Sequence, residues 1–151
     1  MKKDSFTEIV KHLQKKIEDD EKTIYSQKVI NEYKNPTNFG FIKNPDGTGR
    51  IKGPCSDSMR IDLKIKSGKI FESRFWTDGC GTSIACGNML CKIINGKTIQ
   101  EANEIKYQDL LSALDGLPKE NIHCSILAID TLHNSLKNYK NKIKEKIWNL
   151  P

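Results

Sequence analysis

The sequence lacks the features that mark membrane-spanning and secreted proteins. No apolar run among its 151 residues approaches the roughly 18 to 20 that a membrane-spanning helix needs. The N-terminal residues include lysines, but no continuous apolar stretch follows them, and their acidic residues and lack of arginine argue against a transit peptide. We therefore expect one domain that does not enter a membrane and stays in the cytoplasm.

Nucleic-acid binding is not indicated either, because few aromatic residues accompany the basic ones. The chain has 25 basic and 19 acidic residues, a net charge of +6, and 7% aromatic residues. Most of the surplus lies near the C-terminus, at Lys137, Lys140, Lys142, Lys144 and Lys146. Such a stretch is typical of the solvated end of a helix. We expect it to suit a protein partner with an acidic patch rather than a nucleic acid.

The cysteines lack a pairing pattern. The chain has five, an odd number, and none belongs to the C-x2-C pair that is typical of structural zinc sites. Without a secretion signal, a complete disulfide framework is not expected, and thiol chemistry or metal binding is favoured.

The N-terminal part predicts two helices. Ser5 and Glu8 match a capping box, so a first helix should begin near Ser5. Apolar residues follow at helical spacing, at Phe6, Ile9, Val10, Leu13 and Ile17. Acidic residues 19–21 interrupt this pattern, and a second helical pattern runs from Tyr25 to Tyr33 before Asn35-Pro36 ends it.

The middle of the chain predicts an antiparallel strand pair. Ile61, Leu63 and Ile65 alternate with polar residues, as in a strand with one buried face. Ser67-Gly68 is a plausible hairpin turn, and the segment 70–77 returns with a similar alternation. Turn residues around 44–49 separate other short extended pieces.

Helical patterns occupy the rest of the chain. Residues 82–95 have helical composition before Gly96, and Thr98 with Glu101 matches a second capping box. A long amphipathic helix that lies across the sheet is indicated by Ile122, Ile126, Ile129, Leu136, Ile143 and Ile147. The predicted class is α+β, with a small antiparallel sheet of about three strands packed against several helices.

Three cysteines stand at the ends of predicted elements. Cys55 precedes the first clear strand, and strand alternation would place Asp57 on the same side. Cys80, between two glycines, precedes a helix, whose free amide groups favour a thiolate. Cys124 follows His123 near the start of the last helix, where we also expect a depressed pKa. His123 could bond locally, or act as an alternative ligand or proton acceptor.

The other two cysteines, Cys86 and Cys91, lie inside a predicted helix, where a free cysteine usually packs as a small apolar residue. For Cys86, a place in the site stays open. By spacing alone, Cys55, Cys80 and Cys124 leave a metal site and ordinary packing about equally favoured.

Several motifs occur in an order that resembles a known family. They are Tyr25-Ser26-Gln27-Lys28-Val29-Ile30, Asn35-Pro36, Asn38-Phe39-Gly40, Cys55-Ser56-Asp57, Gly79-Cys80-Gly81-Thr82-Ser83-Ile84-Ala85, Gly96-Lys97 and His123-Cys124-Ser125-Ile126-Leu127-Ala128. Together they resemble the iron-sulfur cluster assembly scaffolds of the IscU type and the NifU N-terminal domain, over roughly residues 25 to 140. We expect an N-terminal helical extension at 1–24 and a scaffold domain of this kind at 25–151.

The resemblance implies a scaffold or carrier rather than an enzyme. It implies that Cys55, Asp57, Cys80 and Cys124 bind iron and a transient [2Fe-2S] cluster, with His123 as an alternative ligand. It further implies sulfur from a cysteine desulfurase, Cys124 as the persulfide acceptor, and transfer of the cluster to recipient apo-proteins. A homodimer is compatible with it.

The sequence also departs from the family pattern. Leu117-Pro118-Lys119-Glu120-Asn121 stands where many relatives have the Leu-Pro-Pro-x-Lys motif of a DnaK-type chaperone, which puts that partner in doubt. Two alternatives stay open. The same thiolates and Asp57 could hold zinc, including in the apo form. Less favoured is a thiol enzyme that uses Cys124 with His123 as the base.

Overall fold

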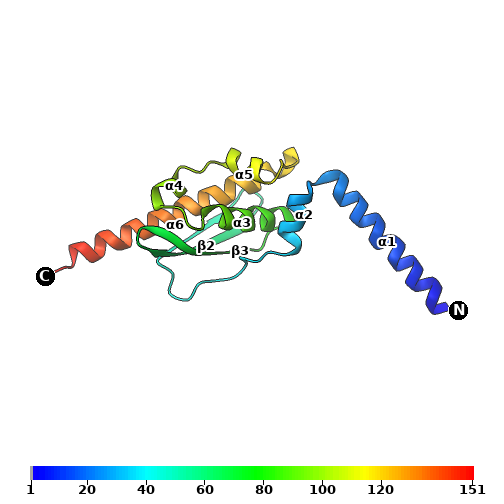
Figure 1. Cartoon of the computed structure of the whole chain (residues 1–151), viewed down its shortest axis with the longest axis horizontal. Coiled ribbons are helices and arrows are strands. Elements are labelled where there is room, and N and C mark those ends of the chain that lie inside the picture. Colours follow the sequence, from blue (N-terminus) through cyan, green and yellow to red (C-terminus); the bar gives the residue numbers. More distant parts are fainter. Residues whose placement is uncertain (1) are drawn as a thin grey trace.

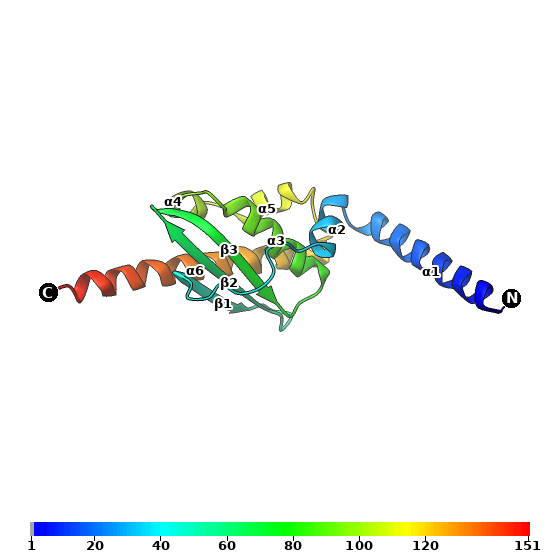
Figure 2. The same ribbon diagram turned by 60° about the horizontal axis from the view of Figure 1, so that its bottom comes forward.

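The computed structural model of the protein describes residues 2–151, and side chains from Ser5 onward. A three-stranded antiparallel sheet carries helices on one face, while α1 (Lys2–Ile24) projects from one end of this body (Figures 1 and 2). No helix in the described part of the chain is long and apolar enough to cross a membrane. The α+β class and the small antiparallel sheet are confirmed.

The sheet has the order β1-β2-β3, formed by β1 (Gly47–Lys52), β2 (Ser58–Lys66) and β3 (Lys69–Thr77). Ile61 and Leu63 are fully buried, as their alternation predicted. Ser67 and Gly68 both have positive φ, which is the conformation of a tight hairpin turn. A bulge shifts the β2–β3 register after Lys64 and leaves Phe71 66% exposed.

Four shorter α-helices and one 3-10 turn accompany the sheet. They are α2 (Gln27–Lys34), α3 (Gly81–Ile94), α4 (Ile99–Asn103), α5 (Tyr107–Ala113) and η1 (Lys119–Asn121). Thr98 caps α4 by accepting a hydrogen bond from the Glu101 backbone N–H at 3.1 Å, and Gly96 has a φ of +85° after α3. The predicted cap and the glycine stop are therefore confirmed.

The last helix, α6 (Ile122–Trp148), crosses the sheet at β1. The Ser135 hydroxyl donates to the Ile61 carbonyl at 2.8 Å. The helix and β1 come so close that a Cβ on Gly49 would lie 2.6 Å from the Ser135 nitrogen. This contact requires glycine in the strand, because any side chain would push the helix away.

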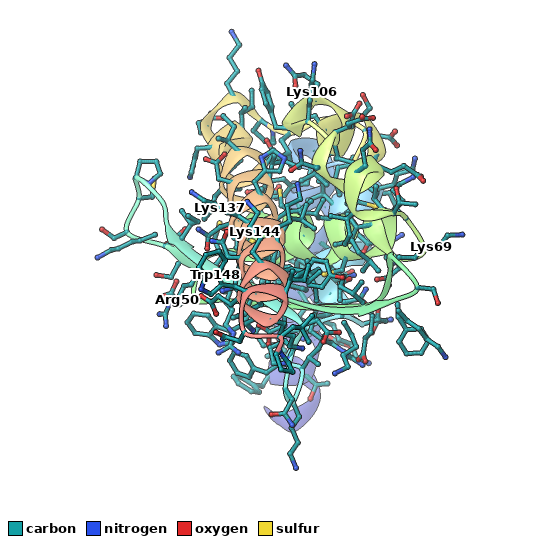
Figure 3. The ribbon with its side chains drawn as sticks, turned by 90° about the vertical axis from the view of Figure 1, so that its left-hand side faces the viewer. Arg50, Lys69, Lys106, Lys137, Lys144 and Trp148 are labelled. Atoms are coloured by element: carbon teal, nitrogen blue, oxygen red, sulfur yellow. The ribbon has the colours of Figure 1, made fainter. Side chains whose placement is uncertain are left out.

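The predicted apolar stripe of α6 is only partly correct. Ile129 and Leu136 are buried, whereas Ile126, Ile143 and Ile147 are exposed. Figures 1 and 2 show the reason for the last two, since α6 continues past the sheet. Figure 3 looks at this overhanging end, with Lys144 and Trp148 on it.

The predicted start of α1 at Ser5 is wrong, because the helix already includes Lys2. Every residue from 5 to 20 is exposed. At its other end α1 is tied to α2, where the Glu21 carboxylate forms an ion pair with Lys34 at 3.5 Å and accepts a hydrogen bond from the Tyr33 hydroxyl. This bond is the main reason that the pKa of Glu21 is lowered.

Candidate functional site

Cys80 is the N-cap residue of α3 and is exposed. Burial of part of the thiol acts to raise its pKa, but the backbone N–H groups and hydroxyls of Ser83 and Thr82 outweigh it, so the pKa is lowered overall. The sulfur makes no cap hydrogen bond of standard geometry, so the effect is that of nearby donors at a helix N-terminus. The predicted thiolate at Cys80 is supported.

Asp57 approaches the same helix end from the start of β2. A Cβ on Gly79 would lie 2.9 Å from the Asp57 Oδ2 and 2.6 Å from the Ser83 Oγ. The residue before Cys80 must therefore lack a side chain for the carboxylate and the hydroxyl to fit there. Asp57 and Cys80 thus share one end of the domain.

Cys124 lies in the first turn of α6, beside this group. Its Sγ accepts a hydrogen bond from the Ser83 hydroxyl at 3.5 Å and lies 3.6 Å from the His123 Nε2. The side chain is only 1% exposed. The neighbouring imidazole is as predicted, but the sulfur faces α3 rather than solvent.

The predicted depressed pKa of Cys124 is wrong. Burial raises the pKa of this thiol to about 11, and the nearby Cys80 and Asp57 add to the rise, against the lowering effect of Ser83. The position at a helix start suggested a stabilised thiolate, but burial between two helices outweighs it.

Cys55 lies in the turn between β1 and β2 and is exposed. The Gly53 N–H donates to the Asp57 carbonyl at 2.6 Å, and Ser56 has a φ of +66°. Because this segment is a turn rather than a strand, the alternation argument for Cys55 and Asp57 does not apply. Among the side chains of residues 5–151, no three from His, Cys, Asp or Glu are grouped closely enough to hold a metal ion in this conformation.

Cys86 and Cys91 are fully buried, as predicted for packing residues. Burial raises the pKa of Cys86 well above its ordinary value, and the neighbouring Cys124 and Cys80 contribute. Burial likewise raises the pKa of Cys91 to about 12. Both cysteines therefore belong to the core, and Cys86 also lies near Cys80 and Cys124.

Tyr33 of α2 lies against Gly81, the first residue of α3, next to Cys80. A Cβ on Gly81 would lie 3.4 Å from the Tyr33 ring. Burial and the hydrogen bond to Glu21 raise the pKa of Tyr33 to about 12. One tyrosine therefore touches both the α3 N-terminus and the end of α1.

Comparison with known proteins identifies the family of this chain. Residues 24–146 match the family model of the NifU-like N-terminal domain. The chain belongs to the NifU-like N-terminal domain family. The residues that precede 24, most of helix α1, lie outside the match.

Relatives of this NifU-like chain include two named iron-sulfur cluster assembly scaffold proteins. The chain is 41% identical over 120 residues to IscU 1 of Archaeoglobus fulgidus, covering 79% of this chain and 78% of the relative. It is 40% identical over 127 residues to IscU of Escherichia coli, covering 81% and 98%. The N-terminal domain of a NifU-like protein from Brucella abortus has the same fold, with a TM-score of 0.64, 15% identity and coverage of 79% and 96%.

Two residues at the NifU-like site were not singled out from the sequence. Ser83 contacts Cys124 and lowers the pKa of Cys80, and Tyr33 packs over Gly81. The position of Ser83, three residues after a helix-capping cysteine, is a usable signal, because amides of a first helical turn face the cap. Nothing in the local sequence distinguishes Tyr33 from an ordinary amphipathic residue.

Proposed function

We propose that this chain is a scaffold on which an iron-sulfur cluster is assembled and then passed to recipient apo-proteins in the cytoplasm. The observation that carries the proposal is that Cys80, Cys124 and Asp57 all lie near Ser83, at the α3 N-terminus of a NifU-like domain. Thiolates are the usual protein ligands of such clusters. The scaffold names of the relatives at about 40% identity support the same role.

The proposed ligands are Cys55, Asp57, Cys80 and Cys124, with His123 as an alternative. Binding requires movement, because Cys124 is buried and, among residues 5–151, no three of these side chains are grouped closely enough to hold a metal ion. The turn 53–57 is the segment that would close over the cluster. The cluster we propose is [2Fe-2S], which takes four protein ligands, the number in this set.

Sulfur would come from a cysteine desulfurase and be accepted at Cys124. The Cys124 thiolate would attack the outer sulfur of the donor persulfide, forming a new S–S bond as the old one breaks and the donor leaves as a thiolate. This step requires that Cys124 first become exposed and lose its proton. His123, 3.6 Å from the sulfur, is placed to take that proton.

The test is anaerobic reconstitution with iron, cysteine and a cysteine desulfurase, followed by visible absorbance and iron content. We expect a coloured cluster in the parent and its loss in Cys80→Ser, because a hydroxyl is a poor ligand for this iron. The matched control is Cys91→Ser, the same change at a core thiol of α3, which should keep the chromophore. A colourless parent that holds zinc would instead favour a zinc-binding protein of the same fold.

A second prediction concerns Asp57. Its carboxylate is a hard oxygen ligand, whereas the three cysteines of the proposed set are soft thiolates. We expect Asp57→Ala to slow cluster transfer to an apo-ferredoxin several-fold, because an exchangeable ligand and a route for incoming thiols are lost. Visible circular dichroism would follow the arrival of the cluster on the ferredoxin.

The control for this prediction is Asp130→Ala, which removes the same charge from an exposed position on α6. Transfer by Asp57→Ala at the parent's rate would end the proposed role for this carboxylate. If both variants transferred the cluster more slowly, the loss of net charge, and not the ligand role of Asp57, would explain the slower rate.

A further inference from the structure

Helix α1 presents an apolar face to solvent. Phe6 is 70%, Leu13 52% and Ile17 59% exposed, and Val10 lies between them on the same side. The steps from 6 to 10, 13 and 17 are four, three and four residues, which is the spacing of a coiled-coil seam. His12, Lys15, Lys16 and Asp19 line the other side of the helix.

This helix is poorly suited to stand alone in water. Isolated helices gain little stability without a packed apolar face, and α1 projects away from the body of its own chain (Figures 1 and 2). Its charges also oppose the helix dipole. Residues 5–16 carry three lysines and one glutamate, whereas residues 17–24 carry four acids and one lysine.

The same charge distribution determines whether a partner helix pairs parallel or antiparallel to α1. A parallel copy would set basic half against basic half and acidic half against acidic half. An antiparallel copy sets each basic half beside an acidic half. We propose that α1 pairs antiparallel with α1 of a second copy of this chain, through Phe6, Val10, Leu13 and Ile17.

The apolar spacing fits this pairing in one register. With the twofold axis between residues 11 and 12, Phe6 lies opposite Ile17 of the second copy, and Val10 lies opposite Leu13. All four apolar positions are then covered by apolar positions, and Asp20 marks the end of the seam. Each helix is about 35 Å long, so the two domains lie at opposite ends of the pair.

Among residues 5–151, no comparable row of exposed apolar side chains lies beside α1. An exposed apolar stretch at 143–150 lies at the opposite end of the molecule (Figure 1), and the exposed Phe39 and Phe41 are two residues of a loop rather than a helical row. The Glu21 contacts to Tyr33 and Lys34 hold the end of α1 at the domain and leave the stripe free to meet a second copy.

The first experiment is analytical ultracentrifugation of the full chain over a wide concentration range. We expect a dimer whose dissociation constant rises at least about 100-fold in Leu13→Asp, because a charge replaces a central apolar contact. The matched control is His12→Asp, which places the same residue on the opposite side of α1 and should stay within about threefold of the parent. A monomeric parent, or a dimer that Leu13→Asp leaves intact, would overturn the proposal.

The second experiment fixes the direction of pairing. A photoreactive benzoylphenylalanine replaces Phe6, and mass spectrometry identifies the peptide to which it crosslinks. Crosslinks to the peptide with Ile17 of a second copy are expected. Crosslinks from Phe6 to Phe6 would mean parallel pairing, and crosslinks to 25–151 would mean docking on the domain, and either result would contradict the antiparallel pair. Neither experiment depends on cluster binding.

Discussion

Cys80 is expected to react with iodoacetamide on the order of 100-fold faster than Cys124 in the folded protein at pH 8. A thiol with a pKa of about 11 is about one part in a thousand thiolate at this pH, whereas the lowered pKa of Cys80 leaves roughly one part in ten or more. The less basic Cys80 thiolate is a weaker nucleophile than the Cys124 thiolate, and this reduces the difference between the two rates about tenfold. The 1% exposure of Cys124 slows it further.

Mass spectrometry of the alkylated peptides would measure both rates in one sample. The pH profile gives a second check, since labelling of Cys80, whose pKa is lowered, should level off at a lower pH than that of Cys124, which keeps rising toward pH 11. The control is the same chain in denaturant, where the two rates should converge. Equal rates in the native protein would mean that Cys124 is already accessible, contrary to its burial between α3 and α6.

Gly49→Val is expected to destabilise the fold by about 3 kcal/mol, the upper end of what overpacking costs. The new Cβ would stand 2.6 Å from the Ser135 nitrogen and 2.7 Å from the Asn134 Oδ1. Backbone atoms of a helix cannot turn aside as a flexible side chain can. Valine favours strands more than glycine does, so strand propensity alone would predict a gain in stability rather than this loss.

Urea unfolding followed by circular dichroism would measure this loss. Lys52→Val is the matched control, because it puts valine at an exposed position of the same strand and should change the stability by no more than about 0.5 kcal/mol. Gly49→Ala should fall between the parent and Gly49→Val. A Gly49→Val midpoint equal to that of Lys52→Val would show that α6 can shift off β1 at little cost.

Much of the fold follows from local patterns in the sequence. Alternation at Ile61 and Leu63, the Thr98 cap and Gly96 predicted a strand and two helix boundaries because each depends on nearby residues. The start of α1 did not follow, since Ser5 can be a helix residue as well as a cap. The bulge that exposes Phe71 depends on strand pairing, which periodicity does not report.

The candidate site, like the fold, was predictable from the sequence only in part. The lowered pKa of Cys80 was predictable, because it depends on amides of the next turn. The burial of Cys124 was not, because it arises where α6 packs against Ser83 of another helix. The proposed metal ligands rest on the family resemblance and stay a prediction, since Cys55 lies on a separate turn.

The contact of Tyr33 with Gly81 has a thermodynamic consequence. The same tyrosine holds the Glu21 carboxylate at the end of α1 and packs on the residue that follows Cys80. Displacing the Tyr33 ring at Gly81 would change the surroundings of Glu21, and displacing it at Glu21 would change those of Gly81. If cluster binding at the thiol end and pairing of α1 each displace this ring, the two events are thermodynamically linked, and each changes the affinity of the other by the same factor.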